Sequence, residues 1–203
     1  MLGIFLDIET TGLDPLLHRP IDIALKVIDL ATGEIKGEYQ SLIKQSSEVW
    51  EQSDPVSIEV NGYTLEQVQQ GKDLEVVRKE VVDLFTRLGI ARGKAFFICQ
   101  NPAFDRGFFT QIVGVYTQEK LNWPYHWLDL ASMYWATFVH GLNESKGSIP
   151  GSINLSKNAI AGKYHIPPEV QPHHAMNGVD HLIQCYQAVI GMQWEYSSEP
   201  ARD

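Results

Sequence analysis

The chain has 203 residues, of which 44% are hydrophobic and 20% charged, with 16 glycines and 10 prolines. This length is enough to bury one sizeable core, and the composition excludes collagen-like, coiled-coil and disordered classes. Two cysteines make a disulfide framework unexpected. Residues 1–6 are apolar but lack a basic leader, and no charge-free run approaches the roughly 18 residues of a membrane-spanning helix. We therefore expect a soluble cytoplasmic protein without a membrane partner.

The formal net charge of −9 limits the partners of the chain. Proteins that neutralise many phosphates usually present a positive face, so extensive binding to a nucleic-acid duplex is disfavoured. That constraint weakens if several acids are metal ligands, because two divalent cations would bring the loaded protein to about −5. The clustering of the acids is therefore the feature that decides the function.

Hydrophobic period and turn residues predict the elements of the chain. In chain order we expect strands over 2–8, 21–30 and 34–43, a loop over 44–55, a short helix from 64, a helix over 73–88, a strand over 95–99, a helix over 102–115, a strand over 125–128, a helix over 129–139, a loop over 141–154, a helix over 155–164 and a last helix ending near 190. An antiparallel meander followed by strand–helix alternation predicts an α/β fold with a mixed sheet flanked by helices. We expect a single domain over residues 1–193 and a flexible tail over 194–203.

Asp7 and Glu9 stand two residues apart at the end of an otherwise apolar strand. This spacing places both carboxylates on one face of the strand. Two buried like charges need a cation or a shared proton, so a divalent metal site is the favoured interpretation. The alternative is a strand end at which both acids simply meet solvent.

Asp105 lies in the first turns of the helix that follows the fourth strand. From there its carboxylate can point toward the carboxyl ends of the strands, where open α/β sheets usually bind ligands. The alternative is a favourable interaction of an acid with the helix dipole, without any ligand.

Asp180 is the only carboxylate between Glu169 and Glu195, and it precedes a core-facing apolar stripe. The adjacent His173 and His174 are either zinc ligands or surface residues. No third soft ligand follows at a suitable spacing, and oxygen-rich clusters of acids prefer Mg²⁺ or Mn²⁺.

Three segments combine into a family resemblance. Residues 5–13 are Phe-Leu-Asp-Ile-Glu-Thr-Thr-Gly-Leu, residues 101–105 are Asn-Pro-Ala-Phe-Asp, and a His-Ala segment precedes Asp180. Together they resemble the motifs of the DEDDh family of 3′→5′ exonucleases, which includes RNase T, oligoribonuclease and the proofreading subunit of bacterial replicative polymerase. The resemblance spans about residues 2–190 and implies a ribonuclease H-like fold, here with a mixed five-stranded sheet.

The resemblance also implies a set of site residues. Two divalent cations, Mg²⁺ or Mn²⁺, would be held by four carboxylates: Asp7, Glu9, Asp105 and Asp180. A histidine would accept a proton from the attacking water. Thr10 and Leu13 would hold the terminal nucleotide; the alternative is that both only form a structural turn.

Two departures from the family concern the second and third motifs. Gln100 stands where the family commonly has histidine. In the family, the last aspartate lies five residues beyond the histidine. In this chain, Asp180 lies six residues beyond His174 and seven beyond His173. The residue five beyond His173 is Gly178, which cannot ligate a metal. We favour His174 as the base, because one residue of slack in a loop is easier to absorb than two, although His173 keeps the family's His-x-Ala pattern.

These observations predict a metal-dependent 3′→5′ exonuclease that releases nucleoside monophosphates from single-stranded ends by two-metal phosphodiester hydrolysis. The alternatives are a nuclease-like, non-catalytic subunit of a polymerase or RNA complex, and a nucleotide phosphohydrolase. The presence of all four acids argues against the non-catalytic subunit. The sequence leaves open DNA or RNA as substrate, and a homodimer or a polymerase as partner.

Overall fold

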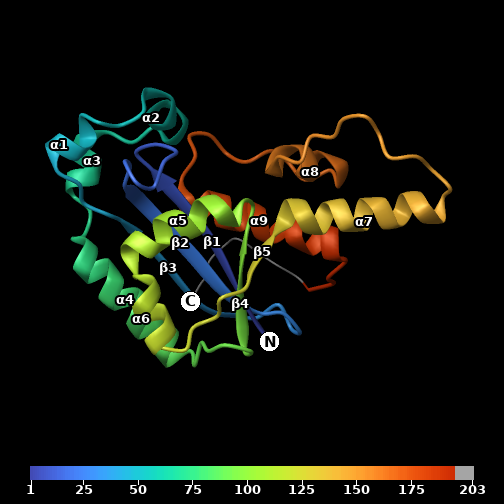
Figure 1. Cartoon of the computed structure of the whole chain (residues 1–203), viewed down its shortest axis with the longest axis horizontal. Coiled ribbons are helices and arrows are strands. Elements are labelled where there is room, and N and C mark those ends of the chain that lie inside the picture. Colours follow the sequence, from blue (N-terminus) through green and yellow to red (C-terminus); the bar gives the residue numbers. More distant parts are fainter. Residues whose placement is uncertain (195–203) are drawn as a thin grey trace, which may run out of the picture.

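The computed structural model describes residues 1–194, which contain a five-stranded mixed sheet of order β3-β2-β1-β4-β5 (Figure 1). The strands are β1 (Leu2–Thr10), β2 (Pro20–Asp29), β3 (Ile35–Leu42), β4 (Ala95–Cys99) and β5 (Trp127–Asp129). β1, β2 and β3 pair antiparallel, whereas β4 is parallel to β1 and β5 is parallel to β4. The predicted ribonuclease H-like α/β fold, with a meander followed by parallel strands, is confirmed.

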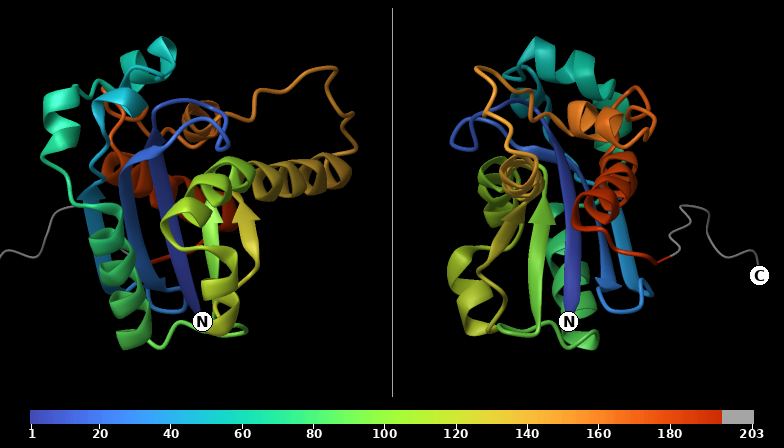
Figure 2. Two further views of the ribbon diagram at one scale, coloured as in Figure 1. Left: turned by 60° about the vertical axis from the view of Figure 1, so that its left-hand side comes forward. Right: turned by 90° about the vertical axis from the view of Figure 1, so that its right-hand side faces the viewer.

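Helices cover both faces of the sheet. They are α1 (Ser47–Trp50), α2 (Pro55–Asn61), α3 (Leu65–Gln69), α4 (Leu74–Arg87), α5 (Pro102–Ile112), α6 (Val115–Lys120), α7 (Leu130–Glu144), α8 (Lys157–Lys163) and α9 (Ala175–Ile190). One buried core joins the sheet to α4 and α5, and a second core joins the opposite face to α7, α8 and α9. Figure 2 shows α9 and α5 on opposite sides of the strands.

β1 is central and buries both of its faces, which explains its continuous run of apolar residues. Ile4 and Leu6 belong to the core under α4 and α5, whereas Phe5 belongs to the core under α9. Because side chains alternate along a strand, Asp7 and Glu9 continue the row of Phe5 on the α9 face. The two acids therefore lie where the sheet and α9 meet.

The structure corrects several predicted boundaries. α2 was not predicted, although Asp54 caps its N-terminus by accepting from two backbone N–H groups and Gly62 ends it at φ 68°. The helix expected over 102–115 ends at Ile112, because Val113 adopts an extended conformation, and α6 follows as a separate helix that was not predicted. α7 runs to Glu144 rather than 139, because Gly141 stays helical inside it.

The chain end is described as far as Trp194. Its side chain packs against the core under α9, and its carbonyl accepts a hydrogen bond of 2.6 Å from Gln187. The rest of the tail expected over 194–203 lies outside the described residues. Within residues 1–194, no helix combines the length and the apolar character needed to cross a membrane.

Candidate active site

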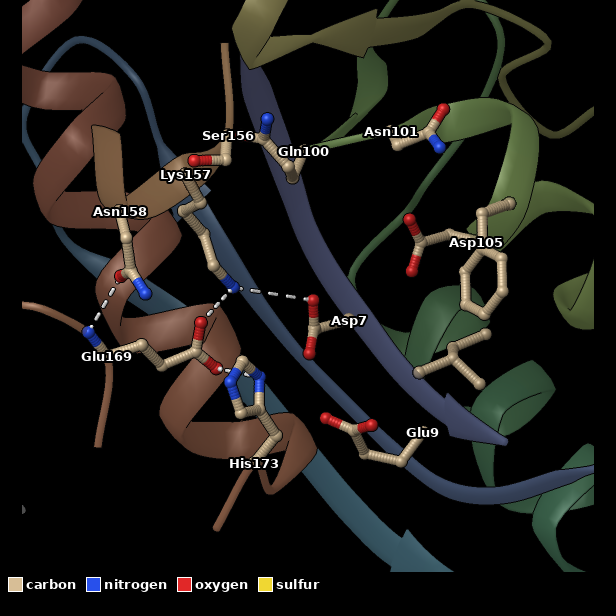
Figure 3. A pocket seen from close by; sticks show the side chains of 12 residues that line it. Asp7, Glu9, Gln100, Asn101, Asp105, Ser156, Lys157, Asn158, Glu169 and His173 are labelled. Atoms are coloured by element: carbon tan, nitrogen blue, oxygen red, sulfur yellow. Dashed lines mark hydrogen bonds and ion pairs between the residues drawn. The ribbon is translucent and has the colours of Figure 1, made fainter. Parts of the chain in front are cut away.

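A pocket of about 340 Å³ opens at the end of β1 (Figure 3). Residues from β1, from the start of α5, from α8 and from the segment before α9 line it: Asp7, Ile8, Glu9, Gln100, Asn101, Phe104, Asp105, Ser156, Lys157, Asn158, Glu169 and His173. Its volume falls within the range of about 300–1,000 Å³ that is usual for small-ligand sites. The pocket is therefore large enough for a nucleotide-sized group.

Three of the predicted site acids, Asp7, Glu9 and Asp105, meet in this pocket. β1 presents the first two on one face, as their spacing predicted. Asp105 comes from the first turn of α5, which Pro102 begins, and its side chain is only 5% exposed. The helix start directs this carboxylate toward the end of the sheet, as the sequence indicated.

Burial and mutual repulsion perturb all three carboxyls. Burial raises the pKa of Asp7, and nearby Glu169 adds to this while Lys157 opposes it. Burial raises the pKa of Glu9 to about 9, with a further contribution from Asp7. The pKa of Asp105 is raised well above its usual value by burial and then by Asp7. Such a cluster gains stability from a bound cation, because a cation offsets the repulsion between like charges.

The other wall of the pocket carries three residues that the sequence analysis did not assign: Lys157, Glu169 and His173. Lys157 Nζ lies 2.8 Å from Glu169 Oε2 and 3.7 Å from Asp7 Oδ1. Glu169 is 1% exposed, and its Oε1 lies 3.4 Å from His173 Nδ1. The His-x-Ala pattern that begins at His173 was the one sequence signal for this wall.

The first turn of α8 positions this wall. Ser156 caps the helix by accepting from the N–H of Ala159, and Gln100 Nε2 donates to the carbonyl of Leu155 at 2.8 Å. Asn158 Oδ1 in turn accepts from the backbone N–H of Glu169 at 2.9 Å. Gln100, which replaces the family's histidine, thus anchors the chain that carries Lys157.

Asp180 does not line this pocket, contrary to the expected ligand set. Its Oδ1 lies 2.6 Å from Lys26 Nζ, and its side chain lines a separate depression on α9. The expectation relied on slack in a loop, but α9 begins at Ala175, so the residues up to Asp180 are already helical. At about 100° per residue, Asp180 lies on a different side of α9 from Gly178, which faces Asp7.

His174 does not line the pocket either, whereas His173 does. His174 is the N-cap residue of α9, and its ring stacks on Tyr63 at 4.7 Å between centroids. Its ring therefore lies beside Tyr63 and not among the residues of the pocket. The expected role of His174 as base is therefore not supported by its position.

A buried network fixes the start of α9. Asp22 Oδ2 accepts from Tyr63 Oη at 2.7 Å and from the N–H of Ala175 at 3.0 Å. Burial raises the pKa of Asp22, while its hydrogen bond from Tyr63 lowers it. The N–H of His173 donates to Val60 O at 3.1 Å, so the pocket histidine is also held at its backbone.

The two residues expected to bind the terminal nucleotide differ in their environment. Thr10 is 4% exposed, and its hydroxyl donates to the carbonyl of Gly12 at 2.7 Å within the turn after β1. Leu13 is 72% exposed on the same loop and is not among the pocket residues. Thr10 thus has a structural role in this turn, and Leu13 is available to a ligand.

The fold and the pocket define a ribonuclease H-like nuclease architecture with carboxylates at the end of the central strand. A sequence model of the RNase_T exonuclease family matches residues 4–177. The chain therefore belongs to this family, as its DEDDh motifs implied. The DEDDh family generally uses divalent metal ions.

Sequence relatives include DNA polymerase III PolC-type proteins. Those of Thermotoga petrophila and Thermotoga maritima are 33% identical over 106 residues and 30% identical over 105 residues, which is 52% of this chain in each case. The matched segments are only 7% of the length of these relatives. The similarity is therefore to one part of a much longer polymerase.

Solved structures share the fold at low sequence identity. Exonuclease I of E. coli in complex with a 5cy-dT13 oligonucleotide aligns with 95% of this chain and 41% of its own, at TM-score 0.69 and 18% identity. The nuclease domain of 3′hExo, a DEDDh family member bound to rAMP, aligns with 98% of this chain and 97% of its own, at TM-score 0.65 and 16% identity. These likenesses support the fold assignment.

Proposed function

We propose that this protein is a metal-dependent exonuclease that removes nucleoside monophosphates from the 3′ ends of single-stranded DNA or RNA. The observation that carries the proposal is the meeting of Asp7, Glu9 and Asp105 with His173 in one pocket at the end of β1. The net charge of −9 favours a short strand end, held by a few contacts, over a long electrostatic groove.

The donor set fits a hard divalent cation. Asp7, Glu9 and Asp105 would hold it, since all three supply carboxylate oxygens, which Mg²⁺ and Mn²⁺ prefer. In the arrangement described for residues 1–194, no three acid, histidine or cysteine side chains converge closely enough to form a ready-made metal site. The expectation of two cations relied on a fourth ligand, Asp180, which lies outside the pocket.

A bound divalent cation would polarise the phosphate and make water a stronger nucleophile. His173 accepts the proton of the attacking water as the new P–O bond forms. Glu169 orients the ring through Nδ1 and leaves Nε2 for that proton. The bond from phosphorus to the 3′ oxygen breaks, and solvent returns a proton to that oxygen.

The test is degradation of 3′-end-labelled DNA and RNA strands in Mg²⁺, Mn²⁺ or EDTA. We expect labelled mononucleotide to be released first and EDTA to stop the reaction. Asp105→Asn should lower the rate by more than about tenfold, or 1.4 kcal/mol of barrier, because it removes a charged metal ligand.

Asp180→Asn is the informative comparison, since Asp180 is an acid on α9 outside the pocket. We expect its rate to stay within about threefold of wild type. Absence of mononucleotide release in either metal would refute the proposed function. Equal losses of rate in Asp105→Asn and Asp180→Asn would indicate that Asp180 is a metal ligand after all.

We further propose that the domain works beside a polymerase, because the PolC-type relatives are polymerases that contain a matching segment. Size-exclusion chromatography of the chain alone, and then with a polymerase subunit, separates this arrangement from the alternative of a homodimer. A stable homodimer that does not bind the polymerase subunit would contradict the proposed association.

A further inference from the structure

The ammonium group of Lys157 is surrounded by carboxylates on the α9 side of the pocket. Its Nζ contacts Glu169 and Asp7 (Figure 3). It also donates to the carbonyl of Gly178 at 3.3 Å. The side chain is 12% exposed, and lysine is rarely buried so far unless it is paired. The carboxylates of Glu169 and Asp7 thus pair this nearly buried ammonium group.

α9 presents backbone rather than a ligand to Asp7. A Cβ atom built on Gly178 would lie 2.2 Å from Asp7 Oδ2, far inside any normal contact. The helix turn that faces the carboxylates of β1 therefore accepts a side chain at position 178 only if the carboxylate of Asp7 shifts. Glu169, from the segment before α9, lines the same pocket, and its carboxylate is paired with Lys157.

The charges of the pocket are consistent with this arrangement. Asp7, Glu9, Asp105 and Glu169 carry four negative charges when ionised. One divalent cation together with the ammonium group leaves a net charge of about −1, whereas two cations would leave about +1 before any phosphate arrives. The ammonium group already contacts Asp7 and Glu169, the two oxygen donors that a second cation on this side would need.

We propose that the site takes a single divalent cation, at Asp7, Glu9 and Asp105, and that the ammonium group of Lys157 occupies the place of a second one. This inference rests on the proposed metal-dependent function. Lys157 then supplies a fixed positive charge to the substrate phosphate, with no dependence on metal concentration. The single-cation inference depends on two residues of this chain. Gly178 stands where α9 faces Asp7, and Lys157 occupies the adjoining space.

The test counts bound metal rather than activity. Mn²⁺ is titrated into the metal-free protein by calorimetry, with and without AMP, and free Mn²⁺ is measured by electron paramagnetic resonance. We expect one Mn²⁺ per wild-type chain. Lys157→Met should bind two, because Asp7 and Glu169 lose their counter-charge. Lys163→Met, at the exposed end of the same helix, is the matched control and should bind one.

Each result decides the proposal. Two Mn²⁺ on the wild type, or one on folded Lys157→Met, would overturn the single-cation inference while leaving a metal-dependent exonuclease in place. No Mn²⁺ on the wild type, together with no strand degradation, would instead refute the proposed function. If thermal melts show that Lys157→Met does not fold, Lys157→Gln replaces it, and the wild-type count decides by itself.

Discussion

The neighbouring residues His173 and His174 provide a sharp test of the site, because only His173 lines the pocket. His173→Ala removes the ring that lies 3.4 Å from Glu169. Loss of a general base typically lowers a rate by about 10² to 10⁴, which is roughly 2.7 to 5.4 kcal/mol of activation barrier. The N–H bond of His173 to Val60 belongs to the backbone, so the substitution leaves the loop anchored.

His174→Ala is the matched comparison. It removes the stacking on Tyr63, in which the ring planes lie 16° apart. An aromatic pair of this kind contributes about 0.5–1.5 kcal/mol, so the thermal midpoint should fall by roughly 1–6 °C in a chain of this size. We expect turnover to stay within about threefold of wild type, because His174 does not line the pocket.

The assay is single-turnover release of the 3′-terminal nucleotide, with enzyme in excess and Mn²⁺ saturating. Mn²⁺ titration of both variants shows whether metal binding is retained, which separates loss of a base from loss of a ligand. If His174→Ala is the slower variant, the assignment of His173 is refuted. Small and equal effects would show that neither ring accepts the proton.

Two further predictions concern stability. Burial raises the pKa of Glu9 from 4.5 to about 9, so the metal-free folded chain keeps a proton that the unfolded chain releases. The stability of the chain in EDTA should therefore fall as pH rises between about 4.5 and 9. In thermal melts from pH 5 to 8.5, Glu9→Gln should make this fall shallower. An unchanged slope of stability against pH would contradict the prediction. Tyr63→Phe removes a donor to the buried carboxylate of Asp22 and should cost about 1–3 kcal/mol in urea unfolding, whereas a loss below about 0.5 kcal/mol would contradict a stabilising bond.

Local spacing was sufficient to predict one wall of the pocket, which carries the carboxylates of Asp7, Glu9 and Asp105. Asp7 and Glu9 share a face because strand residues alternate, and Asp105 reaches the sheet end because Pro102 starts the helix immediately after β4. These relations hold within a few residues of chain. Local rules therefore predicted the fold correctly, and they account for the presence of these three acids in one pocket.

The opposite wall depends on contacts between distant segments. Lys157 contacts Asp7 from α8, and the residue before this helix start, Leu155, is held by Gln100, which is more than fifty residues away in sequence. The placement of Asp180 depended on where α9 begins, and no helix-start signal marked Ala175. The backbone N–H of Ala175 instead donates to Asp22 on β2. The spacing of residues within the third motif does not reveal this contact.

The geometry of Gly178 and Lys157 connects the stability of the pocket to its chemistry. A glycine lets α9 approach β1 closely, and this approach buries Asp7 and raises its pKa. Without a positive charge nearby, such burial would drive the carboxyl toward its neutral, poorly ligating form. Lys157 opposes that tendency from the space beside Gly178, since its ammonium group lowers the pKa of Asp7 against the effect of burial.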